Sequence, residues 1–317
     1  MKKVLITGIN GFVGTYLTSY LLTEKLNITG LVHPSHKGNN PNFPKNKVRL
    51  IKCDLLNKKE LFKALKDESF DYTFHLAAFS SPAESFKNAT QTLENNIFCQ
   101  LNLLETLVKL KSEAKILIIG SAEEYGNVFP KYLPINESAP LAPLSPYAVS
   151  KVAQDLLGYQ FYLHHALKIV RVRPFNHIGP GQSENFVVPA FSRQIVNLEK
   201  RGGGVMKVGN LETWRDFTDV RDIVIGYLLA LEKGKLGEVY NIGSGKMYKI
   251  GDILDKLISF SKVKIKIIRD KKLFRPTEIK KIYCDYSKFK NQTGWVPKID
   301  ITKSLLDTIE YERNKLR

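Results

Sequence analysis

The sequence predicts an α/β protein built on a doubly wound parallel sheet, and three observations support this. Short apolar runs alternate with helix-length segments through roughly residues 1–172. These runs are continuous rather than alternating, as expected of strands buried on both faces of a sheet. A glycine-rich turn follows the first run and opens the first helix, which is typical of a nucleotide-binding sheet. With 317 residues, the chain is long enough for two domains or one large one.

Each element can be justified in chain order. β-branched and other apolar runs predict strands at 3–7, 28–32, 48–54, 72–78, 114–121 and 167–175. The segments between them predict helices at 12–24, 58–67, about 93–111 and about 146–165. After residue 175 the pattern is less regular, with helices near 189–200 and at 219–232 and a solvent-facing strand pattern within 261–281.

This pattern predicts a Rossmann-type domain over 1–172 and a smaller, mixed α/β substrate domain over 173–317. The boundary is not clean. The run "GEVYNIGS" has the character of a strand, so the chain is expected to return to the first domain around 219–245.

Composition argues against several classes of protein. The formal charge is +17, but the excess is mostly lysine and no nucleic-acid-binding motif is visible, so nucleic acid is not an expected partner. There is no apolar run long enough to cross a membrane and no secretory leader, so we expect a cytoplasmic protein. Three cysteines without metal-ligand spacing predict neither a disulfide framework nor a metal site: Cys53, Cys99 and Cys284.

The turn "TGINGFVG" predicts a phosphate-binding loop. Gly8, Gly11 and Gly14 allow a tight turn and bring backbone N–H groups close to a pyrophosphate at the helix N-terminus. The second strand then runs into "HPSHKG", which offers His33 and Lys37 but no acid for a ribose hydroxyl. We therefore expect NADP(H) rather than NAD(H), although these could be ordinary loop residues. Asp54 is better placed for the adenine ring than for the ribose.

The segment "SPYAVSK" predicts a catalytic helix. Tyr147 and Lys151 lie one turn apart on the same helix face, and we expect the lysine to lower the pKa of the phenol toward neutrality. This spacing is common and mostly structural on its own. It gains weight from Ser121 and Glu123, which follow the strand at the sheet edge where α/β proteins bind ligands.

Taken in order, "TGINGFVG", "CDLLN", "HLAA", "GSAEEYG" and "SPYAVSK" resemble the extended short-chain dehydrogenase/reductases that act on nucleotide sugars, over essentially the whole chain. The resemblance implies that Ser121, Tyr147 and Lys151 are catalytic. It also implies a cofactor site formed by Gly8, Asn10, Gly11, Phe12, Val13, Gly14, His33, Lys37, Asp54, Leu55, Leu76, Ala77, Ala78, Asn96, Tyr147, Lys151, Pro174 and His177.

The second half narrows this resemblance. "RPFNHIGPGQ", "VGNLETWRDFTDVRDI", "LFRPTEI" and "TGWVPKI" are similar to GDP-6-deoxy-4-keto-mannose reductases and slightly less similar to GDP-mannose 4,6-dehydratases. The implied substrate-binding residues are Ser80, Asn176, Asn185, Phe186, Arg193, Arg215, Arg275 and Glu278. Arg215 and Arg275 would clamp the nucleotide diphosphate. The arginines could instead form surface salt bridges, and His177 could simply cap its turn.

The resemblance implies reduction of the C4 ketone of a GDP-4-keto-6-deoxy-hexose, such as GDP-4-dehydro-6-deoxy-mannose, by NADPH, giving a GDP-6-deoxy sugar such as GDP-D-rhamnose. The alternative is a GDP-mannose or GDP-manno-heptose 4,6-dehydratase, in which Glu123 is the catalytic base. A third possibility is a non-catalytic subunit that binds nucleotide sugars. A homodimer through the helices at about 93–111 and about 146–165 is also implied, although packing within one chain would explain their apolar stripes nearly as well.

Overall fold

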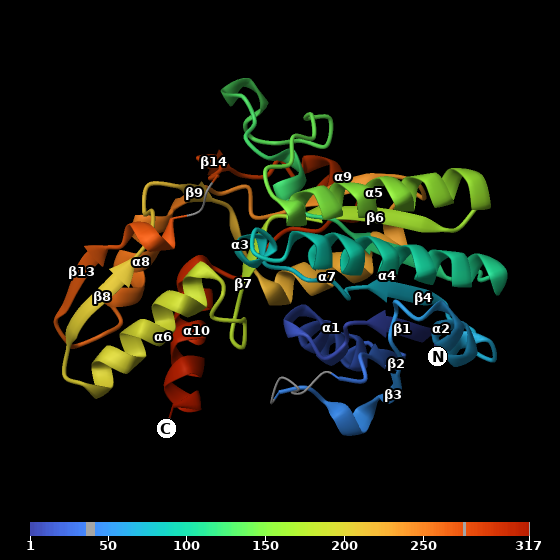
Figure 1. Ribbon diagram of the computed structural model, residues 1–317, viewed down its shortest axis with the longest axis horizontal. Coiled ribbons are helices and arrows are strands. Elements are labelled where there is room, and N and C mark those ends of the chain that lie inside the picture. Colours follow the sequence, from blue (N-terminus) through green and yellow to red (C-terminus); the bar gives the residue numbers. More distant parts are fainter. Residues whose placement is uncertain (36–41, 275–276, 317) are drawn as a thin grey trace.

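The computed structural model describes residues 1–35, 42–274 and 277–316, and its centre is a seven-stranded sheet (Figure 1). The strand order is β11-β6-β5-β4-β1-β2-β3, and every neighbouring pair is parallel. The strands are β1 (Lys3–Thr7), β2 (Asn27–Val32), β3 (Arg49–Lys52), β4 (Tyr72–His75), β5 (Lys115–Ile119), β6 (Ile169–Pro174) and β11 (Val239–Ile242). The predicted parallel α/β sheet is therefore confirmed.

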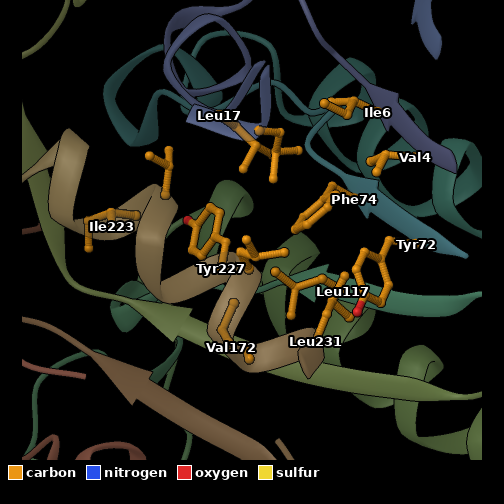
Figure 2. Close-up of a cluster of buried hydrophobic side chains, with 14 of the residues drawn as sticks. Val4, Ile6, Leu17, Tyr72, Phe74, Leu117, Val172, Ile223, Tyr227 and Leu231 are labelled. Carbon is orange, nitrogen blue, oxygen red and sulfur yellow. The ribbon is translucent and has the colours of Figure 1, made fainter. Parts of the chain in front are cut away.

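Helices cover both faces of this sheet. One face packs against α1 (Phe12–Thr23), α7 (Val220–Lys233) and α9 (Ser287–Thr293), and the other against α2 (Lys58–Leu65), α4 (Ala89–Lys109) and α5 (Pro146–His165). Successive strand residues point to opposite faces. Leu117 accordingly joins the core beneath α7, shown in Figure 2, whereas Ile116 and Ile118 join the core beneath α4 and α5.

A third hydrophobic cluster lies outside the large sheet, around α6 (Val187–Lys200), α8 (Ile250–Ile258) and α10 (Ile301–Lys315). These helices pack with the two-stranded sheet of β8 (Gly204–Val208) and β13 (Ile265–Arg269). Short strands connect this part to the rest: β7 (Asn176–Ile178) with β10 (Phe217–Asp219), and β9 (Trp214–Arg215) with β12 (Tyr248–Lys249) and β14 (Lys281–Ile282).

Two predicted strands end earlier than expected. The predicted strand at 72–78 stops at His75, and that at 114–121 stops at Ile119. The residues that follow leave the carboxyl edge of the sheet, which frees their side chains and backbone groups for a site beside it. No helix in the part of the chain that the structure describes is both long and apolar enough to cross a membrane.

Candidate active site

A cavity of about 350 Å³ opens at the carboxyl ends of β1, β4, β5 and β6. It extends from the glycine loop to Phe186, the N-cap residue of α6. The structure brings most of the predicted site residues to its lining: Gly8, Gly11, Phe12, Val13, Gly14, Leu76, Ala78, Ser80, Ser121, Glu123, Tyr147, Lys151, Pro174, Asn176, His177 and Phe186. The lining also includes residues that the sequence did not predict, among them Gln182, Ser183, Tyr227 and Ile282.

The glycine loop has the shape that a pyrophosphate requires. Gly8 has a φ of +67°, and a Cβ there would lie 2.9 Å from the backbone nitrogen of Ala77. A Cβ on Gly14 would lie 2.4 Å from the carbonyl oxygens of Gly8 and Ile9. Helix α1 begins with Gly11 at its N-cap, with no side-chain cap and no acid in its first turn. Its N–H groups and the positive end of its dipole therefore face the cavity, so the site fits a diphosphate.

A buried histidine ties this loop to the next strand. His75 Nδ1 lies 2.9 Å from Thr7 Oγ1, which also accepts a hydrogen bond from the backbone N–H of Ala77 at 3.2 Å. Burial lowers the pKa of His75 to about 3, so the ring is neutral at ordinary pH. The backbone of Ala77 packs against Gly8, and its role in cofactor binding stays a prediction.

Asn96 supports the site without lining it. Its carboxamide is fully buried, accepts from the backbone N–H of Phe79 at 2.7 Å, and donates to the Phe79 carbonyl at 3.0 Å and to Ser150 Oγ at 2.9 Å. The loop after β4 is thereby fixed to α5. Asn96 thus holds two walls of the cavity together, and its role in cofactor binding stays a prediction.

The three predicted catalytic residues converge in the cavity. Ser121 caps the short 3-10 helix η2 (Ala122–Tyr125), and its hydroxyl is hydrogen-bonded to Tyr147. Ser145 caps α5 and Pro146 occupies its first turn, which sets where Tyr147 emerges. One turn later, Lys151 Nζ donates to the carbonyl of Ile119 at 2.9 Å and lies 5.9 Å from the centroid of the Tyr147 ring.

Burial shifts the pKa values of Tyr147 and Lys151. It raises the pKa of Tyr147 above its ordinary value, and the hydrogen bond with Ser121 only partly opposes the rise. The prediction that Lys151 lowers the pKa of Tyr147 toward neutrality is therefore wrong for this structure, because desolvation of the phenolate is the larger effect. Burial also lowers the pKa of Lys151 to about 8, and the nearby Glu124 opposes this shift.

Behind the predicted catalytic residues lies a buried ionic cluster that sequence reasoning missed. Arg171 donates to Asp155 Oδ1 at 3.0 Å, and Arg173 Nε donates to Asp155 Oδ2 at 3.1 Å. Glu124 Oε2 lies 3.0 Å from Arg173 Nε. The signal was present in "IVRVRP", where two arginines interrupt a buried strand and require buried acidic partners.

The residues predicted to recognise the adenosine lie beyond the cavity lining. His33 is exposed, and its Nδ1 accepts a hydrogen bond from the backbone N–H of Ser35. The neutral ring therefore carries its proton on Nε2. This nitrogen lies 3.8 Å from Asp54 Oδ1. Leu55 is buried in the core beneath α4, and Asn10 is also buried. Lys37 lies outside the described residues.

The predicted substrate residues are more scattered. Arg215 lines a smaller hollow that shares Pro82 and Glu123 with the main cavity. Arg193 lies off the cavity, 3.3 Å from Glu184 and 3.4 Å from Glu312. Asn185 is exposed beside the cavity, Glu278 accepts from the side chain of Asn210, and Arg275 lies outside the described residues.

His177 is held rather than free. Its Nδ1 lies 3.2 Å from the carbonyl of Phe175, and its ring stacks parallel to Phe12 at a centroid distance of 6.3 Å. Burial lowers its pKa, so it presents a neutral, flat face to the cavity. Gln182 Nε2 donates to the His177 carbonyl at 2.9 Å and fixes the turn from the other side. Among the described residues, no group of His, Cys, Asp and Glu side chains could hold a metal ion.

Comparisons with known proteins agree with this geometry. A family model described as GDP-mannose 4,6 dehydratase matches residues 5–308. GDP-6-deoxy-D-mannose reductase of Pseudomonas aeruginosa is 33% identical over 100% of this chain and 99% of its own length. GDP-mannose 4,6 dehydratase 1 of Arabidopsis thaliana is 30% identical over 95% of this chain and 87% of its own.

Solved structures agree as well. RMD from Pseudomonas aeruginosa complexed with NADPH has a TM-score of 0.87 at 32% identity, covering 99% of this chain and 100% of that one. A UDP-glucose 4-epimerase from Thermotoga maritima with UDP-glucose has a TM-score of 0.88 at 27% identity, with the same coverage. The chain is thus similar along its whole length to reductases, dehydratases and epimerases of nucleotide sugars.

Proposed function

The chain belongs to the GDP-mannose 4,6 dehydratase family of the extended short-chain dehydrogenase/reductases, and from this premise we propose that it reduces the C4 ketone of a GDP-4-keto-6-deoxy-hexose with NADPH. The proposed substrate is GDP-4-dehydro-6-deoxy-mannose, and the product is a GDP-6-deoxy sugar such as GDP-D-rhamnose. The observation that carries this proposal is the convergence of Ser121, Tyr147 and Lys151 on a cavity that begins at the glycine loop.

The roles of the residues follow from their positions. Bound NADPH supplies the hydride. Tyr147 donates a proton to the oxygen of the former ketone, and its raised pKa keeps the phenol protonated and ready to do so. Ser121 hydrogen-bonds the same oxygen and orients the ketone. Lys151, buried and anchored to the Ile119 carbonyl, holds the nicotinamide ribose.

The preference for NADP(H) over NAD(H) is part of the proposal. His33 and Ser35 follow β2 where an acid would otherwise accept from a ribose hydroxyl, and a similar structure was solved with NADPH. The diphosphate of the cofactor fits the uncapped N-terminus of α1. The adenine is assigned to the side of the loop that carries Asp54.

The substrate is assigned to the other end of the cavity. Asn176 and Phe186 lie on the lining there, Ser80 lines the wall that follows β4, and Arg215 lies in the adjoining hollow, where its guanidinium suits a diphosphate. Three described residues that line neither hollow are also assigned to the proposed substrate site: Asn185, Arg193 and Glu278. Arg275, which lies outside the described residues, is kept in the proposal on the resemblance alone. The choice of GDP over another nucleotide rests on the similarity to the reductase.

One observation favours a second function. Glu123 lines both hollows and lies two residues after Ser121, where a carboxylate could remove the proton beside a C4 ketone. In a GDP-mannose 4,6-dehydratase this group would be essential and the cofactor would be recycled. The presence of Glu123 does not by itself decide between the two activities, but the effect of replacing it would.

The test is the absorbance of NADPH after the protein is mixed with GDP-4-keto-6-deoxy-mannose. We expect stoichiometric oxidation of NADPH, slower turnover with NADH, and a decrease in kcat of about 100-fold or more in Tyr147→Phe, because the proton donor is lost. Cofactor affinity should be unchanged in this variant. Full activity of Tyr147→Phe would contradict the assignment.

A dehydratase would give a different result in the same assay. NADPH would remain. In a second assay with GDP-mannose as the substrate, the wild type would form the keto sugar and Glu123→Gln would not. Binding of a GDP-sugar without any reaction would instead indicate a nucleotide-sugar-binding subunit.

We also propose a homodimer formed through α4 and α5. Both helices leave large apolar side chains exposed, including Phe98, Leu156 and Leu163. This face lies on the side of α5 opposite the cavity, so pairing would leave the active site open.

A further inference from the structure

Glu124 is a fully buried acid directly behind the catalytic serine. Its side chain has 0% exposure, and it is not among the residues that line the cavity, whereas its neighbour Glu123 lines it. Burying a carboxyl group is costly unless hydrogen bonds or charges compensate for it. The contacts of Glu124 therefore indicate what the burial achieves.

One carboxyl oxygen holds the backbone of Ser121. The Ser121 N–H donates to Glu124 Oε1 at 2.7 Å, while Ser121 Oγ accepts from the backbone N–H of Glu123 at 3.1 Å. The two hydrogen bonds close a capping box at the start of η2. Oε1 reaches this position because residue 120 is glycine: a Cβ there would lie only 2.3 Å from it.

The other oxygen faces the arginine that anchors the catalytic helix. Glu124 Oε2 lies 3.0 Å from Arg173 Nε, whose N–H is directed at Asp155 on α5. Arg173 also donates to the hydroxyl of Tyr125 at 3.0 Å. Asp155 lies four residues, one turn, after Lys151 on the same side of the helix. The segment that carries Ser121 and the helix that carries Tyr147 and Lys151 are thus fixed to one buried cluster.

We propose that Glu124 is a positioning residue of the reaction: its buried carboxyl group fixes Ser121 so that the serine hydroxyl meets both Tyr147 and the ketone oxygen. Glu124 touches neither substrate nor cofactor and acts through Ser121. The inference rests on the proposed reductase function and adds a residue to it. It also assigns different tasks to two adjacent glutamates, since Glu123 faces the cavity and Glu124 faces the interior.

The test is a double-mutant cycle between Glu124 and Ser121, measured by NADPH oxidation with GDP-4-keto-6-deoxy-mannose. Glu124→Leu removes the acceptor at similar volume, and we expect kcat to fall about 10- to 100-fold, because small misplacements of catalytic groups have effects of this size. KM should change by less than about threefold, because no substrate contact is lost. In a Ser121→Ala background, Glu124→Leu should have no further effect on kcat.

Glu124→Gln provides rescue by a conservative change. Burial beside Asp155 raises the pKa of Glu124 above its ordinary value, so an amide resembles the carboxyl group closely. The amide oxygen can still accept from the Ser121 N–H. We therefore expect Glu124→Gln to keep kcat within about threefold of the wild type, because the bond to Ser121 survives. If Glu124→Leu does not fold, the cycle is run with Glu124→Ala and Glu124→Gln.

The matched control is Glu199→Gln, which alters another glutamate paired with an arginine, Arg313, away from the cavity. It should leave kcat and KM unchanged. Full turnover of Glu124→Leu, or an equal loss of kcat with and without Ser121, overturns the positioning role while leaving the reductase function standing. A wild-type protein that does not oxidise NADPH overturns the proposed function, and this inference with it.

Discussion

Some side chains of the site face the cavity, and others fix the position of those that do. Tyr147 and Ser121 are hydrogen-bonded to each other, and Lys151 is tied to the backbone of β5. Because the phenol is buried, the protein favours its neutral form, which suits proton donation better than proton removal. The electrostatics of this site therefore agree with a reduction, in which a new alkoxide needs a proton.

Lys151 gives the site a pH dependence that can be measured. Burial lowers its pKa to about 8, so the ammonium is charged below that pH and loses its proton as the pH rises through it. A charged donor binds ribose hydroxyls more strongly than a neutral one. We expect NADPH affinity, measured by fluorescence titration, to be constant from pH 6.5 to 7.5 and about tenfold weaker at pH 9, since each unit above the pKa reduces the protonated fraction about tenfold.

Two variants separate this effect from general changes with pH. Lys151→Met should bind NADPH weakly and show no such decrease. Lys115→Met is the matched control, because the Lys115 ammonium also donates to a backbone carbonyl, that of Leu231 at 2.9 Å, but outside the cavity. It should retain the wild-type profile. A wild-type affinity that is constant up to pH 9 would show that Lys151 does not hold the cofactor through its charge.

At this scale, local motifs identified the reacting groups but not their supports. Tyr147 and Lys151 were predictable because one helical turn separates them. The cluster of Glu124, Asp155 and Arg173 was not, since its members come from three elements that only the fold brings together. The sign of the Tyr147 pKa shift was missed for the same reason: burial is a property of the assembled site.

Among the elements, the turn from β1 into α1 leaves no room for additional side-chain atoms at two of its glycines, Gly8 and Gly14. Alanine in a helix is normally more stable than glycine, by about 1 kcal/mol. At Gly14 this gain should be reversed, because a Cβ would lie 2.4 Å from two backbone oxygens of the loop. We expect Gly14→Ala to lower the free energy of unfolding by about 1–3 kcal/mol and to weaken NADPH binding at least about tenfold, as overpacking shifts the backbone.

Chemical denaturation and NADPH titration check this prediction. Gly251→Ala is the control: Gly251 lies in the first turn of α8 with a negative φ, and its nearest Cβ contact would be an ordinary 3.5 Å. This variant should be as stable as the wild type or slightly more stable, with unchanged cofactor affinity. Normal NADPH binding by Gly14→Ala would mean that the loop does not carry the diphosphate.

The strands of the large sheet could be predicted because each lies in a continuous apolar run, and the segments between the runs have the length of helices. The predicted helix at 146–165 has the observed bounds, and the strand at 3–7 does as well. In the second half, β9, β12 and β14 contain two residues each and pair segments far apart in sequence. Strands this short leave no periodic signal, so their pairing depends on tertiary contacts that the sequence alone does not reveal.

In the whole molecule, the part built around α6, α8 and α10 lies beside the large sheet (Figure 1), and residues of the sheet and the cap residue of α6 line the cavity. Its walls come from both parts: Tyr147 and Lys151 from the helix beside the sheet, and Phe186 from the cap of α6. The proposed cofactor site therefore belongs to the sheet, and the proposed sugar site to the junction. This arrangement explains why the cofactor motifs were local in sequence, whereas the predicted substrate residues, apart from Ser80, were spread over 176–278.

The surface formed by α4 and α5 exposes several large apolar side chains. On α5, Val149, Leu156 and Leu163 recur every seven residues, which places them on one face, with exposures of 44%, 52% and 63%. Phe98 on the neighbouring α4 is 50% exposed. Large contiguous apolar patches are rare on the surface of monomeric proteins, so exposed apolar side chains that share a helix face indicate a candidate interaction surface. Intramolecular packing, which could have explained the stripes, leaves these four side chains uncovered.

A second copy of the chain is the occupant that we propose for this face, and its removal should be measurable. We expect the wild-type protein to sediment at twice the mass of one chain, and Leu156→Arg to sediment as a single chain, because an arginine in the centre of a paired apolar face would be buried without a partner. Leu306→Arg is the control, since Leu306 is an exposed leucine on α10, away from α4 and α5. It should remain dimeric. If the wild-type protein sediments as a single chain at micromolar concentration, the proposed homodimer is contradicted.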